Sequence, residues 1–167
     1  MSYVKIWIHA VWGTKHRQPI LSKEKRNELF FHIKENAKQK ELYIDSINGH
    51  VDHVHCLLAL NAEMSISKAI GLIKGESSFW ANKQKLFEHK FEWADEYFAA
   101  SVSDSAVEKV RTYILNQEAH HNKKTFSEEY SGFLKVTGFD VMAKASTNTS
   151  GIVPAINGGV NKLSLLS

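Results

Sequence analysis

Residues 51–60 read Val-Asp-His-Val-His-Cys-Leu-Leu-Ala-Leu, an apolar run that contains two histidines, His53 and His55, two positions apart. Alternate side chains of a β-strand share a face, so a strand over 53–60 presents both imidazoles on the same side. Two imidazoles on one face can bind a single cation through their ring nitrogens. The stretch therefore predicts a central strand and, on it, a candidate metal site.

A second segment, residues 113–117, reads Tyr-Ile-Leu-Asn-Gln. Residues four apart on a helix share a face, so Tyr113 and Gln117 are expected to point the same way. If this helix crosses the histidine strand, a phenol and a carboxamide meet two imidazoles. That group would place a divalent metal beside a nucleophilic hydroxyl, an arrangement suited to cutting a phosphodiester.

The remaining segments predict an α+β fold. Their order is strand, helix, strand, strand, helix, strand, followed by an extra C-terminal helix that carries the tyrosine. This order gives a ferredoxin-like split βαβ antiparallel sheet with both earlier helices on one face, so the extra helix can lie over the other. The expected strands cover 3–12, 42–48, 53–60 and 96–103, and the expected helices begin at Ser22 (to about 40), at Ser65 and at a capping box over 105–108 (to about 124).

The composition is that of an ordinary globular protein. The chain has 167 residues, 43% of them hydrophobic, so one folded domain is expected over 1–140, followed by a flexible tail over 141–167 that is rich in Ser, Asn, Thr and Gly. Its one cysteine, Cys56, excludes an intramolecular disulfide and is consistent with a reducing, cytoplasmic location. No apolar run approaches the ~20 residues that span a bilayer, so no membrane partner is expected. A net charge of +3 permits a nucleic-acid partner without requiring one.

These motifs together resemble the single-tyrosine HUH transposases of bacterial insertion sequences, the TnpA-like proteins, to which the REP-associated tyrosine transposases are closely related. In that family a histidine–hydrophobic–histidine strand and a helix-borne tyrosine form the active site. The likeness extends over residues 3–140 and depends on the order and spacing of several segments. They are 12–17 (Trp-Gly-Thr-Lys-His-Arg), 52–55 (Asp-His-Val-His), 72–78 (Leu-Ile-Lys-Gly-Glu-Ser-Ser), 93–102 (with Trp93, Tyr97, Phe98, Ser101 and Val102) and 113–117.

The resemblance implies an enzyme. It makes Tyr113 the nucleophile, and it makes His53, His55 and Gln117 the ligands of a divalent metal, for which Mg²⁺ or Mn²⁺ is suited. The implied reaction cleaves and rejoins single-stranded DNA at element ends flanked by stem-loops, through a 5′-phosphotyrosine intermediate. The resemblance also implies a homodimer in which the tyrosine helix of one protomer completes the site of the other.

Three basic residues are candidate DNA contacts. Lys15 and Arg17 follow the first strand in a basic loop, where they could bind phosphates. Lys74 stands beside Gly75 in the second helix, where a backbone could approach closely. The alternative for each is an ordinary solvated surface charge.

Four other functions can be compared with the same residues: two kinds of hydrolytic enzyme, a nucleic-acid-binding module and a domesticated transposase. A histidine-triad hydrolase or nucleotidyl transferase needs a third histidine at position 57, which is Leu57. A phosphoesterase with two H-x-T or H-x-S motifs also fails, because Cys56 and Leu57 follow His55 and no second copy appears. A non-catalytic nucleic-acid-binding module would use stacking aromatics on an open sheet face, for which Trp7 is a candidate. A domesticated relative that processes chromosomal palindromes would share every site residue and stays open.

Overall fold

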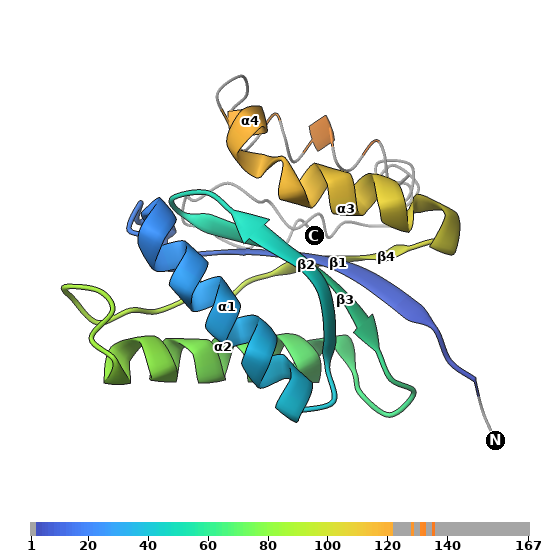
Figure 1. Cartoon of the computed structure of the whole chain (residues 1–167), viewed down its shortest axis with the longest axis horizontal. Coiled ribbons are helices and arrows are strands. Elements are labelled where there is room, and N and C mark those ends of the chain that lie inside the picture. Colours follow the sequence, from blue (N-terminus) through green and yellow to red (C-terminus); the bar gives the residue numbers. More distant parts are fainter. Residues whose placement is uncertain (1–2, 122–127, 129–130, 133–134, 136–167) are drawn as a thin grey trace, which may run out of the picture. The chain divides into compact units, whose positions relative to one another are not determined.

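The computed structural model describes residues 3–121, 128, 131, 132 and 135 (Figure 1). The chain forms two compact units, Met1–Lys123 and Lys124–Ser167. All the strands and helices named below belong to the first unit, and the described residues of the second are helical. The expected boundary after residue 140 and the expected tail over 141–167 lie outside the described residues. Within the described part, every helix is too short or too polar to cross a membrane.

The first unit is built on a four-stranded sheet. Its strands are β1 (Ile6–Gly13), β2 (Tyr43–Gly49), β3 (His53–Leu60) and β4 (Phe98–Val102). They lie in the order β2-β3-β1-β4, and each neighbouring pair is antiparallel. This order places the first and third strands in the centre, as a split βαβ unit requires, so the expected ferredoxin-like sheet is confirmed.

Two helices cover one face of this sheet. They are α1 (Lys23–Gln39) and α2 (Ile66–Lys83), whose apolar side chains share one core cluster with Ile8, Ala10 and Cys56 of the central strands. The hydroxyl oxygens of Ser22 and Ser65 accept hydrogen bonds from the backbone N–H groups of the third residue beyond each, so both expected N-caps are confirmed.

A third helix, α3 (Val107–Leu115), covers the opposite face of the sheet, and Figure 1 shows the sheet between α3 and α2. Val107, Val110 and Ile114 pack on Leu57 of β3 and Val102 of β4 in a second core cluster. The helix carries Tyr113 as the sequence suggested, and its apolar residues are the ones expected. Among the described residues, α3 therefore lies over the face of the sheet that α1 and α2 do not cover.

Two expectations about this helix are wrong. The capping box over 105–108 does not form, because a short 3-10 turn, η2 (Asp104–Ala106), leads into α3 and Ala106 takes the N-cap position without a side-chain hydrogen bond. The helix also does not run to residue 124. It ends at Leu115, Asn116 leaves helical geometry (φ −94°, ψ 18°), and a separate helix α4 (Gln117–His121) follows.

The hairpin between β2 and β3 depends on Gly49, as expected. Gly49 pairs with Val54, and His50 N–H donates to the carbonyl oxygen of His53 at 3.0 Å. A Cβ atom at position 49 would lie 2.1 Å from that same carbonyl oxygen, a distance that backbone atoms cannot tolerate. Only glycine allows this approach, which sets where β3 begins and hence where His53 stands.

We expect Gly49→Ala to destabilise the fold by at least about 2 kcal/mol, because the new methyl group collides with backbone rather than with a side chain that could move. Urea denaturation followed by circular dichroism measures the change. Gly71→Ala is the matched control: Gly71 lies in α2 with nothing within 4 Å of an added Cβ, so a gain of up to ~1 kcal/mol is expected. Equal stability of Gly49→Ala and the wild type would contradict the close approach.

Candidate active site

Three buried histidines lie on the sheet face beneath α3. His53 and His55 come from β3, and His9 comes from the neighbouring strand β1. Their exposed fractions are 0%, 2% and 0%, and the ring of His55 lies 5.2 Å, centroid to centroid, from each of the other two rings. The alternation of both strands therefore places the two predicted histidines together, as expected, and adds a third imidazole beside them.

His53 is oriented by the residue before it. Asp52 accepts a hydrogen bond from Nδ1 of His53 at 2.7 Å. Burial alone would raise the pKa of Asp52, but the hydrogen bond from His53, together with the charge and hydrogen bond of Arg17, holds that pKa below its ordinary value. The carboxylate is thus ionised and favours the proton on Nδ1, which leaves Nε2 as the imidazole nitrogen with a lone pair.

Arg17 holds the other side of this carboxylate. Its Nη2 and Nε atoms lie 2.8 Å and 3.0 Å from Oδ2 of Asp52. Arg17 belongs to a short 3-10 turn, η1 (Lys15–Arg17), in which His16 and Arg17 both have φ 55°, a left-handed conformation that costs about 1–2 kcal/mol per non-glycine residue. Hydrogen bonds from Lys15 N to Glu92 O and from Arg17 N to Thr14 O hold this turn in place.

His55 has a different partner. Nε2 of His9 and Nδ1 of His55 lie 3.1 Å apart. Burial lowers the pKa of His9 to about 3, so this imidazole is neutral at ordinary pH. His9 was absent from the predicted site. The available signal was its place on the same face of the first strand as Trp7 and Val11, but only the pairing of β1 with β3 shows that this face continues the histidine face.

Tyr113 lies over this cluster within the same chain. Its ring centroid is 5.7 Å from that of His55 and 6.2 Å from that of His9. The side chain is partly buried beside the second core cluster, and Ile114, the next residue, is fully buried. The helix that carries the phenol is thus held by its own apolar stripe against the strand that carries the imidazoles.

An ion pair fixes the position of α3 on the sheet. The pairing of β2 with β3 shifts between Ile44 and Ser46, which leaves Asp45 as the extra residue of a bulge. Arg111 of α3 binds both carboxylate oxygens of Asp45, with N–O distances of 2.8 Å. This fork geometry lowers the pKa of Asp45, chiefly through the hydrogen bonds from Arg111. Arg111 stands two residues before Tyr113, so the pair anchors the tyrosine segment directly.

Gln117 is held in a way that the sequence did not indicate. It is the first residue of α4, beyond the break at Asn116, so the four-residue spacing from Tyr113 does not come from one continuous helix. The side chain is nevertheless fully buried, and its Nε2 lies 3.5 Å from the carbonyl oxygen of Tyr113. Its Oε1 atom is also buried and accepts no hydrogen bond from any described residue.

These donors suit a cation held by two imidazoles and an amide oxygen. The buried Oε1 of Gln117 has no described hydrogen-bond donor, and the hydrogen bond to Asp52 uses Nδ1 of His53 rather than Nε2. In the described part of the chain, no three His, Cys, Asp or Glu side chains meet in a metal-binding arrangement. The buried oxygen of Gln117 is thus the further polar group that this part of the chain offers to the proposal below.

Comparison with known proteins assigns the family. The family model described as "Transposase IS200 like" matches residues 2–117. The chain belongs to the IS200-like transposase family. It is 28% identical over 115 residues to the transposase for insertion sequence element IS200 of Salmonella typhimurium, covering 65% of this chain and 74% of that protein. It is 26% identical over 122 residues to the ISDra2 transposase TnpA of Deinococcus radiodurans, covering 70% and 84%.

Solved structures share the fold of this IS200-like transposase. The crystal structure of a candidate transposase from Deinococcus radiodurans has a TM-score of 0.54 and 28% identity, and the match covers 70% of this chain and 95% of that one. A REP-associated tyrosine transposase bound to a REP hairpin has the same TM-score of 0.54 with 16% identity, and covers 72% of each chain. The α+β fold inferred from the sequence is thus confirmed by both.

Of the three basic residues singled out in the sequence of this transposase, Lys15 and Arg17 share the turn η1, whereas Lys74 lies in α2. Arg17 is paired with Asp52 beside His53. Lys74 lies on α2, which covers the opposite face of the sheet, and its Nζ donates to the carbonyl oxygen of Asp95 at 2.9 Å. A role in DNA binding for each of them stays a prediction.

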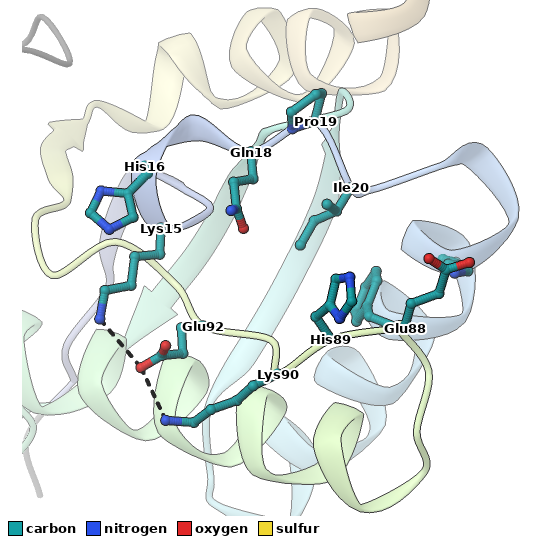
Figure 2. Close-up of a pocket in the computed structure, with 11 residues that line it drawn as sticks. Lys15, His16, Gln18, Pro19, Ile20, Glu88, His89, Lys90 and Glu92 are labelled. Atoms are coloured by element: carbon teal, nitrogen blue, oxygen red, sulfur yellow. Dashed lines mark hydrogen bonds and ion pairs between the residues drawn. The ribbon is translucent and has the colours of Figure 1, made fainter.

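Lys15 borders a separate pocket of about 740 Å³ (Figure 2). Figure 2 shows Lys15 and Lys90 reaching the same carboxylate, Glu92, whose Oε1 lies 3.3 Å from each Nζ. Lys25 and Phe87 also line this pocket, whereas the histidine cluster and Tyr113 do not. The pocket is therefore distinct from the candidate active site. Its cationic rim, formed by Lys15, Lys25 and Lys90, lies next to η1.

The Asp45–Arg111 pair should make the stability of this transposase depend on pH. The pKa of folded Asp45 lies below the ordinary 3.8, so the pair stabilises the fold above pH 3.8 and loses this contribution as the pH falls through the folded pKa. We expect Asp45→Asn to be less stable than the wild type at pH 7, with the difference shrinking below pH 3.8.

Urea denaturation across that range measures this difference. Glu88→Gln, which removes an exposed carboxylate, is the control and should follow the wild type at every pH. A difference between Asp45→Asn and the wild type that stays constant into acid would contradict an ion pair between Asp45 and Arg111.

Proposed function

We propose that this protein is a DNA transposase that cleaves and rejoins single-stranded DNA through a covalent bond to Tyr113. The observation that carries the proposal is the meeting, on one sheet face, of the Tyr113 phenol with the imidazoles of His53 and His55 in a chain of the IS200-like transposase family. Packing alone does not account for a phenol beside these imidazoles, because apolar residues would fill the same space without burying polar atoms.

A divalent cation, Mg²⁺ or Mn²⁺, belongs to this proposal. His53, His55 and Gln117 would hold it, the two imidazoles through nitrogen and Gln117 through its buried Oε1. When bound, it would polarise the scissile phosphate and stabilise the charge that develops on its oxygens. Asp52 fixes the imidazole of His53 for this task by holding its Nδ1 proton.

The chemical steps follow from the phenol. The phenolic oxygen of Tyr113, after losing its proton, attacks the phosphorus, and the bond from phosphorus to the 3′ oxygen breaks. The chain is then joined to the 5′ phosphate, and the leaving oxygen takes up a proton to become a free 3′-hydroxyl. A second 3′-hydroxyl reverses these steps on the phosphotyrosine and restores a phosphodiester. One phosphoester bond replaces another at each stage, so no nucleotide cofactor is needed.

The proposed substrate is a single strand with a stem-loop. One structural relative is described as bound to a REP hairpin, which supports a folded DNA strand as ligand. Lys15, Arg17 and Lys74 stay candidate phosphate contacts, and the cationic rim of the pocket beside η1 lies next to the first of these. The same chemistry would serve a domesticated protein that processes chromosomal palindromes, because the two differ only in their DNA substrate. A cytoplasmic location stays part of the proposal.

The structure disfavours a non-catalytic module that binds nucleic acid on its sheet. That function requires exposed aromatics on an open face. Trp7, the candidate, packs against the second core cluster and meets the ring of Tyr43 at 6.1 Å, so α3 and its neighbours already occupy this face.

We expect the protein to form a covalent adduct with a fluorescent single-stranded stem-loop in the presence of Mn²⁺, seen as a shifted band on a denaturing gel. Tyr113→Phe should abolish the adduct because it removes the attacking oxygen, whereas Tyr3→Phe, at a tyrosine that is 90% exposed, should not. His53→Ala should abolish cleavage and leave binding on native gels largely intact, with the exposed His89→Ala as control. Cut DNA without an adduct would indicate a hydrolase and refute the mechanism.

The finer proposal is a homodimer whose sites are completed in trans. The single chain places Tyr113 over its own histidines, and an exchange of α3 between two protomers would preserve every contact of α3 with the sheet. Because η2 alone joins β4 to α3, it would act as the hinge of the exchange. The resemblance to the HUH transposases supports action in trans. The alternative is action in cis, in which each Tyr113 serves the histidines of its own chain.

Mixing two inactive variants separates these arrangements. Tyr113→Phe keeps its histidines and His53→Ala keeps its tyrosine, so co-refolded heterodimers contain one intact site only if tyrosines cross between protomers. We expect adduct formation to return, to about half of the wild-type level in purified heterodimers and to about a quarter in an equal mixture, where about half of the dimers are heterodimers. A mixture as inactive as either variant alone, with heterodimers verified by two affinity tags, would establish cis action.

A further inference from the structure

Each histidine of the predicted pair is held through the same ring nitrogen. Nδ1 of His53 lies 2.7 Å from Oδ1 of Asp52, and Nδ1 of His55 lies 3.1 Å from Nε2 of His9. Asp52 directly precedes β3, whereas His9 lies in the neighbouring strand β1. The site thus contains two similar histidines with two chemically different anchors.

The anchored nitrogen decides which tautomer each imidazole adopts. A neutral imidazole has one N–H and one lone pair, and the lone pair is the part that can bind a metal. Without constraint, histidine favours the proton on Nε2. A hydrogen-bond acceptor at Nδ1 reverses this preference and directs the Nε2 lone pair outward. Asp52, an acceptor only, does this for His53.

We propose that His9 is a positioning residue that holds His55 as the Nδ1–H tautomer, by accepting the Nδ1 proton on its own Nε2, and so prepares Nε2 of His55 for the metal. This inference depends on the metal site of the proposed function and adds a residue to it. His9 is not a third ligand: its Nε2 faces Nδ1 of His55, and in the described part of the chain His9 does not complete a group of three histidines that could hold a metal.

The difference between the two anchors has a physical reason. Asp52 keeps 20% of its side chain exposed and is paired with Arg17, so its charge is compensated. Room for Arg17 comes from Gly13, where an added Cβ would lie 3.1 Å from Cδ of Arg17. His9 is fully buried in a central strand, where a carboxylate would be costly. A neutral imidazole can accept the same proton there without burying a charge.

The test compares His9→Gln with His9→Leu. The amide oxygen of glutamine can take the place of Nε2 as acceptor, whereas leucine fills a similar volume and accepts nothing. The ¹⁵N shifts of the imidazole nitrogens, read by long-range proton–nitrogen NMR on the metal-free protein, report the tautomer of His55 directly. We expect Nδ1–H in the wild type and in His9→Gln, and Nε2–H in His9→Leu.

Manganese affinity is the second measurement, by titration with Mn²⁺ followed by electron paramagnetic resonance. His9→Leu should bind Mn²⁺ about 10- to 100-fold more weakly, the usual effect of losing an anchor behind a ligand, and His9→Gln should recover most of that loss. Thermal unfolding shows whether each variant folds. Recovery by glutamine cannot come from packing alone, because leucine is the better packing residue.

Several outcomes would overturn the inference. His55 with its proton on Nε2 in the wild type would do so without any variant, even if His9→Leu failed to fold. Unchanged Mn²⁺ affinity and tautomer in a folded His9→Leu would do so as well. Failure of the wild type to bind Mn²⁺ would instead count against the proposed function, and the metal-free NMR measurement would still decide the role of His9.

Discussion

The structure of this transposase depends on burying polar side chains between a sheet and a helix without leaving them uncompensated. His9, His53, His55 and Gln117 are each at most 2% exposed, although all four carry hydrogen-bonding atoms. Such burial costs free energy unless partners are supplied. The Asp52–His53 and His9–His55 hydrogen bonds supply part of this compensation. These bonds connect the histidines of β3 to β1 and to Asp52, the residue before β3.

The position of α3 is the second requirement. The helix buries an apolar stripe on Leu57 and Val102, but apolar contacts tolerate sliding and rotation. The two hydrogen bonds from Arg111 to Asp45 are directional, and Asp45 is the extra residue of a bulge in β2. Asn48 adds a hydrogen bond from its side chain to the carbonyl oxygen of Leu115, at the end of the same helix. The edge strand thus sets the height and rotation of the tyrosine helix over the histidines.

The break after Leu115 connects this anchoring to Gln117. A continuous helix would keep Gln117 one turn beyond Tyr113 on a straight axis. Instead Gln117 begins a separate helix, α4. The next residue, Glu118, forms ion pairs with Lys23 and Arg26 of α1. Arg26 is only 4% exposed, so its ion pair with Glu118 holds the beginning of α4 against α1. Gln117, the residue before Glu118, is fully buried at this helix start.

The sequence by itself determined the sheet, its faces and the two central groups of the site. Alternation in β1 and β3 and helical periodicity in α1, α2 and α3 are local properties, so they can be read from spacing, and Gly49 marks the hairpin. Tertiary structure decided what depends on long-range pairing. The register of β1 on β3 places His9 beside His55. The bulge at Asp45 places its carboxylate where Arg111 of α3 can bind it. The break at Asn116 and the failed capping box came from packing, which overrides weak local preferences at helix ends.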